Sequence, residues 1–222
     1  MGYKNDRTYT NAIHDNIAVN TIYPAMQWQL TSVNHELSEM QDSEYAIDYH
    51  AIDINNVHIV IQERFRRQSN ANFNDFTIRY ERPNNEEEVE QKSEFFKMKA
   101  KIKRFSEPFY MIYGILNASL DGFDKWVVIY LRAFFRHYAN KKIKIDFTKK
   151  FSQIQDNTLI CGWNQNNDDS SSFICINIPQ IMQLFDDVVV YQEGFVPKRT
   201  GGATEKQIKK LQIMASKNGF QL

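Results

Sequence analysis

Acidic, amide and basic side chains gather on one predicted hairpin between residues 45 and 66. Its first strand carries Asp48 and Asp53, and its second ends in the triplet Gln62-Glu63-Arg64, after the apolar run Ile59-Val60-Ile61. Side-chain oxygens are the ligands that hard divalent cations prefer, and a nearby cation can steady an attacking water or a phosphate. The pattern therefore predicts metal-dependent chemistry on phosphate esters. The alternative is an ordinary hairpin with solvated charges on one side.

The length of the hairpin loop decides which side chains share a face. Asn55-Asn56 suits the positive φ values of a tight turn, and a two-residue loop there sets Asp48 opposite Glu63. A three-residue loop sets Asp48 opposite Gln62 instead. Because side chains alternate between faces along a strand, only the second register brings Gln62 and Arg64 to the face of Asp48. We favour this second register.

The hairpin resembles the PD-(D/E)XK nuclease superfamily. Asp48 takes the place of the motif's aspartate and Gln62-Glu63-Arg64 that of its (D/E)-x-K triplet, with thirteen residues between Asp48 and Gln62. The resemblance covers roughly residues 44 to 131. It extends to three segments similar to phage-borne members: Phe76-Thr-Ile-Arg-Tyr80, Ser93-Glu-Phe-Phe-Lys97 and Tyr113-Gly114. It implies a restriction-endonuclease-like core that hydrolyses DNA phosphodiester bonds with Mg²⁺ or Mn²⁺, in phage or mobile-element DNA metabolism.

The same resemblance implies a role for each site residue. Asp48 would ligate the metal, and Gln62 or Glu63 would complete the site. Arg64 would stabilise charge on the phosphate, with Lys97 as a migrated second cation. Two residues depart from the family pattern. Gln62 adds no negative charge, which weakens Mg²⁺ binding, and Arg64 stays protonated and cannot accept a proton.

These departures motivate a second hypothesis, a nuclease-like scaffold that has lost catalysis and binds nucleic acid or another protein, such as a host enzyme that it inhibits. In either case Lys97, Lys101 and Arg104 recur at helical spacing and predict a solvent-facing basic stripe for DNA phosphates. A second basic block runs over residues 132–150. A homodimer is compatible with the sequence.

Bulk composition excludes several classes. The 222 residues carry 27 basic and 27 acidic side chains, so no global positive charge points to nucleic acid. Cys161 and Cys175 lie in apolar runs, without the histidine spacing of a zinc site, and are expected to be buried free thiols. The sequence starts without the apolar core of a signal peptide and contains no run long enough to span a membrane, so we expect a cytoplasmic protein.

The elements predict an α/β or α+β fold with a mixed central sheet flanked by helices. Strands are expected at 44–54, 57–66, 75–82, 108–116, 126–131, 143–147, 157–163, 172–178 and 188–192, and helices at 8–30, 32–40, 93–101, 132–139 and 179–185. Residues 1–193 would form one domain, followed by a linker over 194–203 and a helical tail over 204–222. His50 could assist at the metal, and Asp75 or Glu81 could supply a further acid, although structural roles are the default for all three.

Overall fold

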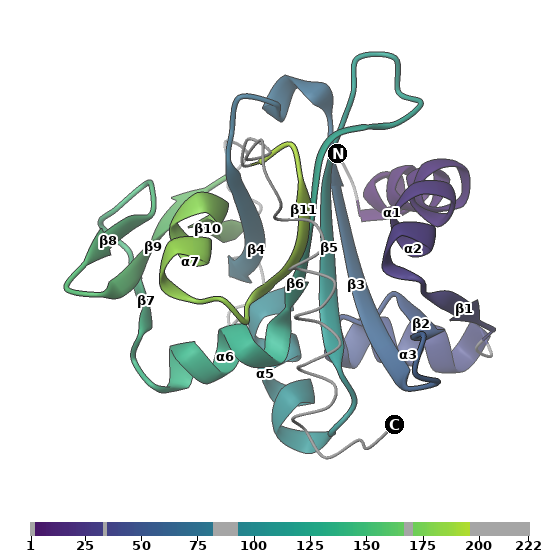
Figure 1. Cartoon of the computed structure of the whole chain (residues 1–222), viewed down its shortest axis with the longest axis horizontal. Helices are drawn as coiled ribbons and strands as arrows, with labels where there is room; N and C mark the ends of the chain where they lie inside the picture. Colours follow the sequence, from purple (N-terminus) through teal and green to yellow (C-terminus); the bar gives the residue numbers. More distant parts are fainter. Residues whose placement is uncertain (1–2, 33–34, 82–92, 167–170, 196–222) are drawn as a thin grey trace.

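The computed structural model describes residues 3–32, 35–81, 93–166 and 171–195, and two mixed β-sheets flanked by helices make up this part of the chain (Figure 1). The α+β class expected from the sequence is confirmed. The single central sheet is not, because the strands divide into a six-stranded and a five-stranded sheet. The expected helical tail and nearly all of the expected linker lie outside the described residues.

The six-stranded sheet carries the hairpin of interest. In spatial order its strands are β1 (Gln29–Thr31), β2 (Tyr49–Ile52), β3 (His58–Arg66), β5 (Phe109–Leu116), β6 (Phe123–Tyr130) and β11 (Val189–Glu193). Strands β3 and β5 are parallel, and the other neighbours are antiparallel. The middle strands are covered on both faces, which explains their nearly continuous apolar sequences.

The second sheet packs beside the first. Its strands are β4 (Asp75–Glu81), β10 (Ser172–Asn177), β9 (Thr158–Gln165) and β7 (Ile143–Asp146) in spatial order, with β8 (Gln153–Gln155) also paired to β9. Cys161 of β9 and Cys175 of β10 are buried free thiols, as expected. Burial raises the pKa of Cys175 to about 12, so this thiol stays protonated and unreactive.

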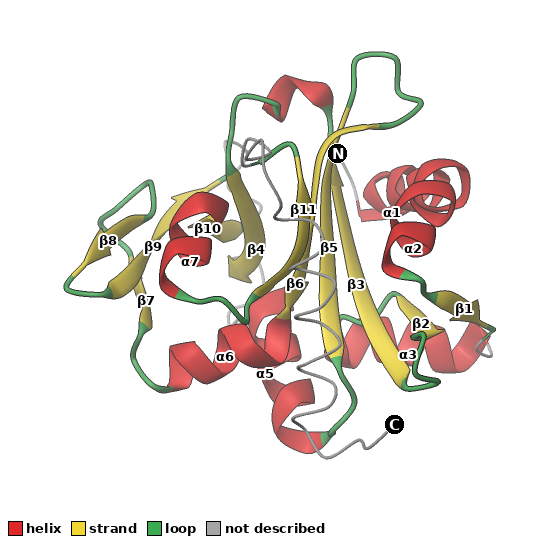
Figure 2. Ribbon diagram, viewed as in Figure 1, coloured by secondary structure: helices red, strands yellow, loops and turns green. Residues whose placement is uncertain are grey.

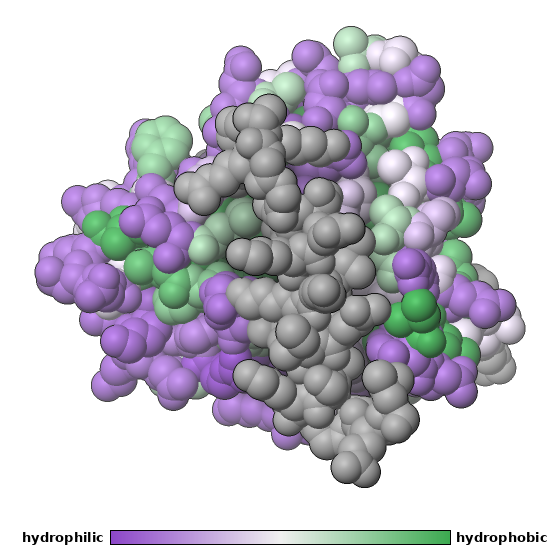
Figure 3. All heavy atoms as spheres, viewed as in Figure 1, coloured by the Kyte–Doolittle hydropathy of each residue, from purple (hydrophilic) through white to green (hydrophobic). Residues whose placement is uncertain are grey.

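Helices cover both faces of the six-stranded sheet (Figure 2). On one face lie α1 (Tyr3–Ile13), the π-helical segment η1 (His14–Ala18) and α2 (Val19–Met26). The remaining helices are α3 (His35–Tyr45), α5 (Glu94–Arg104), α6 (Leu131–Ala139) and α7 (Ile178–Leu184), with a short 3₁₀ turn at Gln68–Asn70. None of the described helices is long and apolar enough to cross a membrane. Hydrophilic residues dominate the edge near β7, β8 and α6 (Figure 3).

Two local differences from the sequence expectation affect the site. The helix expected over residues 8–30 is divided into α1, η1 and α2, and α2 contains Pro24 and ends at Met26, after which Gln27 adopts a left-handed conformation with φ of 55°. Helix α3 runs on to Tyr45, so the first hairpin strand begins at Tyr49 rather than at residue 44. Asp48 therefore lies in the short link between a helix and a strand.

The hydrophobic core has two layers, one on each face of the six-stranded sheet. Ile59 and Ile61 of β3 pack with η1 and α2, whereas Val60 packs on the opposite face with α5, α6 and the second sheet. This alternation sets the direction of every polar side chain further along β3. Even-numbered residues face the second sheet and α5, and odd-numbered residues face the N-terminal helices.

Candidate functional site

The hairpin adopts the register favoured from the sequence. Tyr49 pairs with Ile61 and Ile52 with His58, and Asp53 N–H donates to Val57 O at 3.0 Å to close a three-residue loop. Asn56 in that loop has φ of 60°, the left-handed conformation that asparagine tolerates. The hairpin register is therefore confirmed.

Asp48 is tied to β3 at the position opposite the triplet. Its N–H donates to Ile61 O at 2.9 Å, and its Oδ2 accepts from Glu63 N–H at 2.7 Å. These two bonds hold Asp48 against the backbone of Ile61 and Glu63, the two neighbours of Gln62 on β3. The carboxylate is thus held by a backbone N–H of β3.

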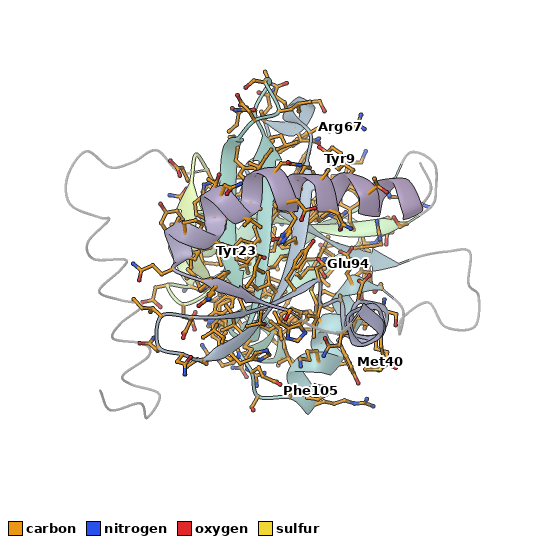
Figure 4. The ribbon with its side chains drawn as sticks, turned by 90° about the vertical axis from the view of Figure 1, so that its right-hand side faces the viewer. Tyr9, Tyr23, Met40, Arg67, Glu94 and Phe105 are labelled. Carbon is orange, nitrogen blue, oxygen red and sulfur yellow. The ribbon has the colours of Figure 1, made fainter. Side chains whose placement is uncertain are left out.

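Arg64 connects this face of β3 to helix α5. Its Nη1 donates to Glu94 Oε2 at 2.8 Å, and both side chains are mostly buried. Glu94 also accepts from Arg79 N–H at 3.1 Å, and its Oε1 lies 3.6 Å from Arg79 Nη1. Glu94 begins the first turn of α5, and Figure 4 labels it between the N-terminal helices and α3. The sequence did not predict these contacts, because the partners of Glu94 lie on β3 and β4.

Asp48 lies in an acidic environment. Burial raises the pKa of its carboxyl well above the usual 3.8, and the Asp42 carboxylate raises it further. Glu63 and Glu94 add smaller increases, while the hydrogen bond from Glu63 N–H lowers the pKa. Several negative charges near one partly buried carboxyl disfavour its ionised form, and a bound cation would relieve that repulsion.

Replacing Asp48 with asparagine should therefore stabilise the protein at neutral pH. A carboxyl whose folded pKa is raised binds its proton more tightly in the folded state, so its contribution to stability declines as pH rises from 3.8 through the folded pKa. Asparagine keeps an oxygen for Glu63 N–H and carries no charge. We expect thermal unfolding to show Asp48→Asn melting above wild type at pH 8, with the gap closing toward pH 3.

The exposed Asp156 offers a matched control, and Asp156→Asn should melt with wild type across this range. A gap at Asp48 that does not depend on pH would contradict the electrostatic explanation.

Gln62 supplies an unpaired oxygen on the face of Asp48. The residue is 6% exposed, and its Nε2 donates to Glu63 O at 3.2 Å. Its Oε1 is buried and has no hydrogen-bond partner among the described residues. A buried amide oxygen left without a partner is uncommon and can serve as a cation ligand.

Glu63 does not belong to this face, which corrects its assignment as a catalytic and metal-binding residue. Its side chain points to the N-terminal helices, where His14 Nδ1 lies 3.1 and 3.0 Å from its two oxygens. Tyr23 OH donates to Oε1 at 2.7 Å, and the His14 ring stacks on Tyr49 at 3.6 Å. Only the odd position of Glu63 on β3 could have indicated this buried cluster before the structure was known.

The expected basic stripe is also corrected. Lys101 is only 5% exposed, with its Nζ 3.5 Å from Glu107 Oε2 and 3.8 Å from the centre of the Phe105 ring. Lys97 Nζ donates to Asp42 O at 3.3 Å, and Arg104 Nη1 donates to Tyr45 OH at 3.1 Å. Helix α5 thus turns Lys97 and Lys101 toward α3 and the chain after α5 rather than to solvent.

His50 and Asp75 have partners other than Asp48 and Gln62. His50 contacts Gln41 and His58. Asp75 begins β4, where burial raises its pKa, and the side chain of Glu81 lies outside the described residues. Where the structure describes the chain, no three His, Cys, Asp or Glu side chains come together as metal ligands. Asp48 and the Gln62 amide thus form a partial ligand set.

No protein-family model matches the sequence, and comparison with curated proteins and with solved structures finds no match.

Proposed function

We propose that the protein is a metal-dependent nuclease that hydrolyses DNA phosphodiester bonds. The observation that carries the proposal is the Asp48 carboxylate, which accepts from Glu63 N–H next to Gln62, together with the buried Gln62 amide oxygen, which has no hydrogen-bond partner among the described residues. Oxygen ligands of this kind suit Mg²⁺ or Mn²⁺, and the acidic surroundings of Asp48 favour a cation. A bound Mg²⁺ would activate a water and offset charge on the phosphate.

The protein's own groups would position the substrate around that site. Arg64 stays protonated at any working pH and can hold a phosphate oxygen through its planar fork of N–H donors. Glu94 anchors Arg64 at 2.8 Å, so the guanidinium has a fixed position on the face that carries Asp48. Lys97, bonded to a backbone oxygen of α3, is the second cation that we assign to this region. A role in phage or mobile-element DNA metabolism fits this activity.

The test is DNA cleavage by wild type and Asp48→Asn, with single-stranded, duplex and branched substrates and either Mg²⁺ or Mn²⁺. We expect Asp48→Asn to lose at least about 100-fold in rate, equivalent to about 2.7 kcal/mol of transition-state stabilisation. Because the same substitution should raise the melting temperature, unfolding cannot explain the loss. Asp156→Asn should cleave like wild type. Equal cleavage by Asp48→Asn and wild type, or none by wild type, would contradict the proposal.

A second candidate is a nuclease-like scaffold that binds nucleic acid or protein without cleaving it. It is favoured by Gln62 standing in place of a carboxylate and by Arg64 being engaged with Glu94. Calorimetry with Mn²⁺ separates the two candidates. Saturable binding that Asp48→Asn abolishes supports the enzyme, whereas DNA binding without any Mn²⁺ binding supports the scaffold.

A further inference from the structure

A pocket of about 610 Å³ lies on the same face of the sheet as Asp48 but contains different residues. His50 of β2, His58 at the start of β3 and Gln41 of α3 line it, together with Lys101 and Glu107. Met40 and Phe105, labelled close together in Figure 4, also line it. His50 is buried, with 8% of its surface exposed, whereas His58 is exposed. The pair therefore has one imidazole in the interior and one at the surface.

The two imidazoles face each other through single ring nitrogens. His50 Nδ1 and His58 Nε2 lie 3.1 Å apart, and their ring centres are 5.0 Å apart. Two nitrogens bound to one metal at 2.0–2.1 Å, with an angle of 90–110° at the metal, lie about 2.8–3.4 Å apart. The observed separation falls within that interval. The cross-strand pairs His50–Val60 and Ile52–His58 hold the histidines at diagonal positions on one face.

A neighbouring amide sets the tautomer of His50. Gln41 Oε1 lies 2.5 Å from His50 Nε2, and because a carbonyl oxygen only accepts, Nε2 carries the hydrogen. The neutral ring then presents the lone pair of Nδ1 to His58. A histidine that donates one ring N–H to a fixed oxygen and offers its other nitrogen is typical of metal-binding imidazoles.

The charged groups around the pair also suit a metal. Burial lowers the pKa of His50, and His58 and Lys101 lower it further, so the ring is neutral near pH 7. The Glu107 carboxylate acts in the opposite direction and raises the pKa of His50. His58 in turn is one of the groups that lower the pKa of Glu107. Lys101 is the positive charge in the pocket, and Glu107 balances it at 3.5 Å. Glu44 is a second carboxylate on the wall.

We propose that His50 Nδ1 and His58 Nε2 bind a transition metal of the Zn²⁺ class, with the Glu107 carboxylate as the third ligand. Imidazole nitrogens select Zn²⁺, Ni²⁺ or Cu²⁺ over Mg²⁺. Among the described residues, no third ligand side chain is already positioned beside the two histidines. Glu107 would therefore leave Lys101 and rotate to the metal, and water would occupy the remaining coordination positions. The site is independent of the proposed nuclease function and would link α3, the hairpin and the chain after α5.

The experiment is calorimetric titration of the full chain with Zn²⁺, for wild type and the variants His50→Gln and His58→Gln. We expect one Zn²⁺ per chain in wild type and at least a tenfold loss of affinity in each variant. His137→Gln is the matched control, because His137 pairs with Asp187 outside the pocket. His137→Gln should bind Zn²⁺ like wild type, and excess Mg²⁺ throughout the titration keeps the proposed Asp48 site from contributing to the Zn²⁺ signal.

Two further measurements test the assigned ligands. Gln41→Leu removes the partner that fixes the His50 tautomer, and we expect about 10–100-fold weaker binding of Zn²⁺. Co²⁺ in place of Zn²⁺ should give an absorption spectrum without a thiolate charge-transfer band. The proposal is overturned if wild type shows no saturable Zn²⁺ binding, if both histidine variants bind like wild type, or if Co²⁺ reports a thiolate ligand from Cys161 or Cys175.

Discussion

Replacing Glu63 with alanine should lower the free energy of unfolding by about 3–5 kcal/mol, because it removes one side of a buried polar cluster. The Glu63 side chain is fully buried, and His14 is only 5% exposed. In the alanine variant, His14 Nδ1 and Tyr23 OH would lose the carboxylate that now accepts from both. Polar groups left unpaired in the interior carry their full desolvation penalty. The cavity left by the missing Glu63 side chain lowers the free energy of unfolding further.

The measurement is urea-induced unfolding at pH 7, followed by circular dichroism. Tyr23→Phe removes one hydrogen bond from the cluster and should cost about 0.5–1.5 kcal/mol. Glu63→Gln keeps the shape of the side chain and one acceptor oxygen, so its loss in free energy of unfolding should lie between those of Tyr23→Phe and Glu63→Ala. Glu63→Ala at wild-type stability would show that the cluster does not hold η1 and α2 on the sheet. If Glu63 were instead a metal ligand, Mg²⁺ would stabilise wild type but not Glu63→Gln.

The local geometry of the hairpin could be predicted from the sequence. The three-residue loop, the position of Asp48 next to Gln62 and the shared face of Gln62 and Arg64 follow from alternation along two short strands and from Asn56 in the turn. All of these contacts lie within about twenty residues of chain, where spacing alone determines register. The predicted start of β2 at residue 44 was wrong, because residues 44 and 45 complete the last turn of α3.

The partners of the site could not be predicted, because they come from distant parts of the chain. Glu63 meets His14 across a sequence separation of 49, and Arg64 meets Glu94 across 30. His50 and His58 are closer in sequence, yet their diagonal contact depends on the register, and Gln41 depends on how α3 packs. The alternation of side chains along β3 shows that Glu63 lies on the face opposite Asp48. It does not show which residues Glu63 contacts there.

The division into two sheets was missed for a related reason. Strand β4 follows β3 closely in sequence, which favours a hairpin between them, but β4 pairs with β10 and β3 pairs with β5. The apolar pattern of β4 fits either sheet, since both sheets contribute side chains to the shared core that contains Phe76 and Ile78. Long-range pairing of this kind is decided by tertiary packing, which strand propensity does not report.

Phe76 joins the two sheets, and replacing it with alanine should destabilise the protein by about 3–5 kcal/mol. The residue lies on β4 and is 0% exposed. Its ring centre is 6.4 Å from that of Tyr113 on β5 and 6.2 Å from that of Phe134 on α6, both in edge-to-face orientation. Alanine would leave a cavity at the point where both sheets and α6 meet, and the surrounding strands can close it only partly.

Phe73 offers a matched control, because it is the same residue type three positions earlier and is 49% exposed. We expect Phe73→Ala to change the free energy of unfolding by less than about 1 kcal/mol, the range of most surface substitutions. Urea unfolding monitored by tryptophan fluorescence and by circular dichroism measures both variants. Coincident transitions in Phe76→Ala would show that the sheets still unfold together, and separate transitions would show that Phe76 couples them. A loss for Phe76→Ala no larger than that for Phe73→Ala would contradict its role as the contact between the two sheets.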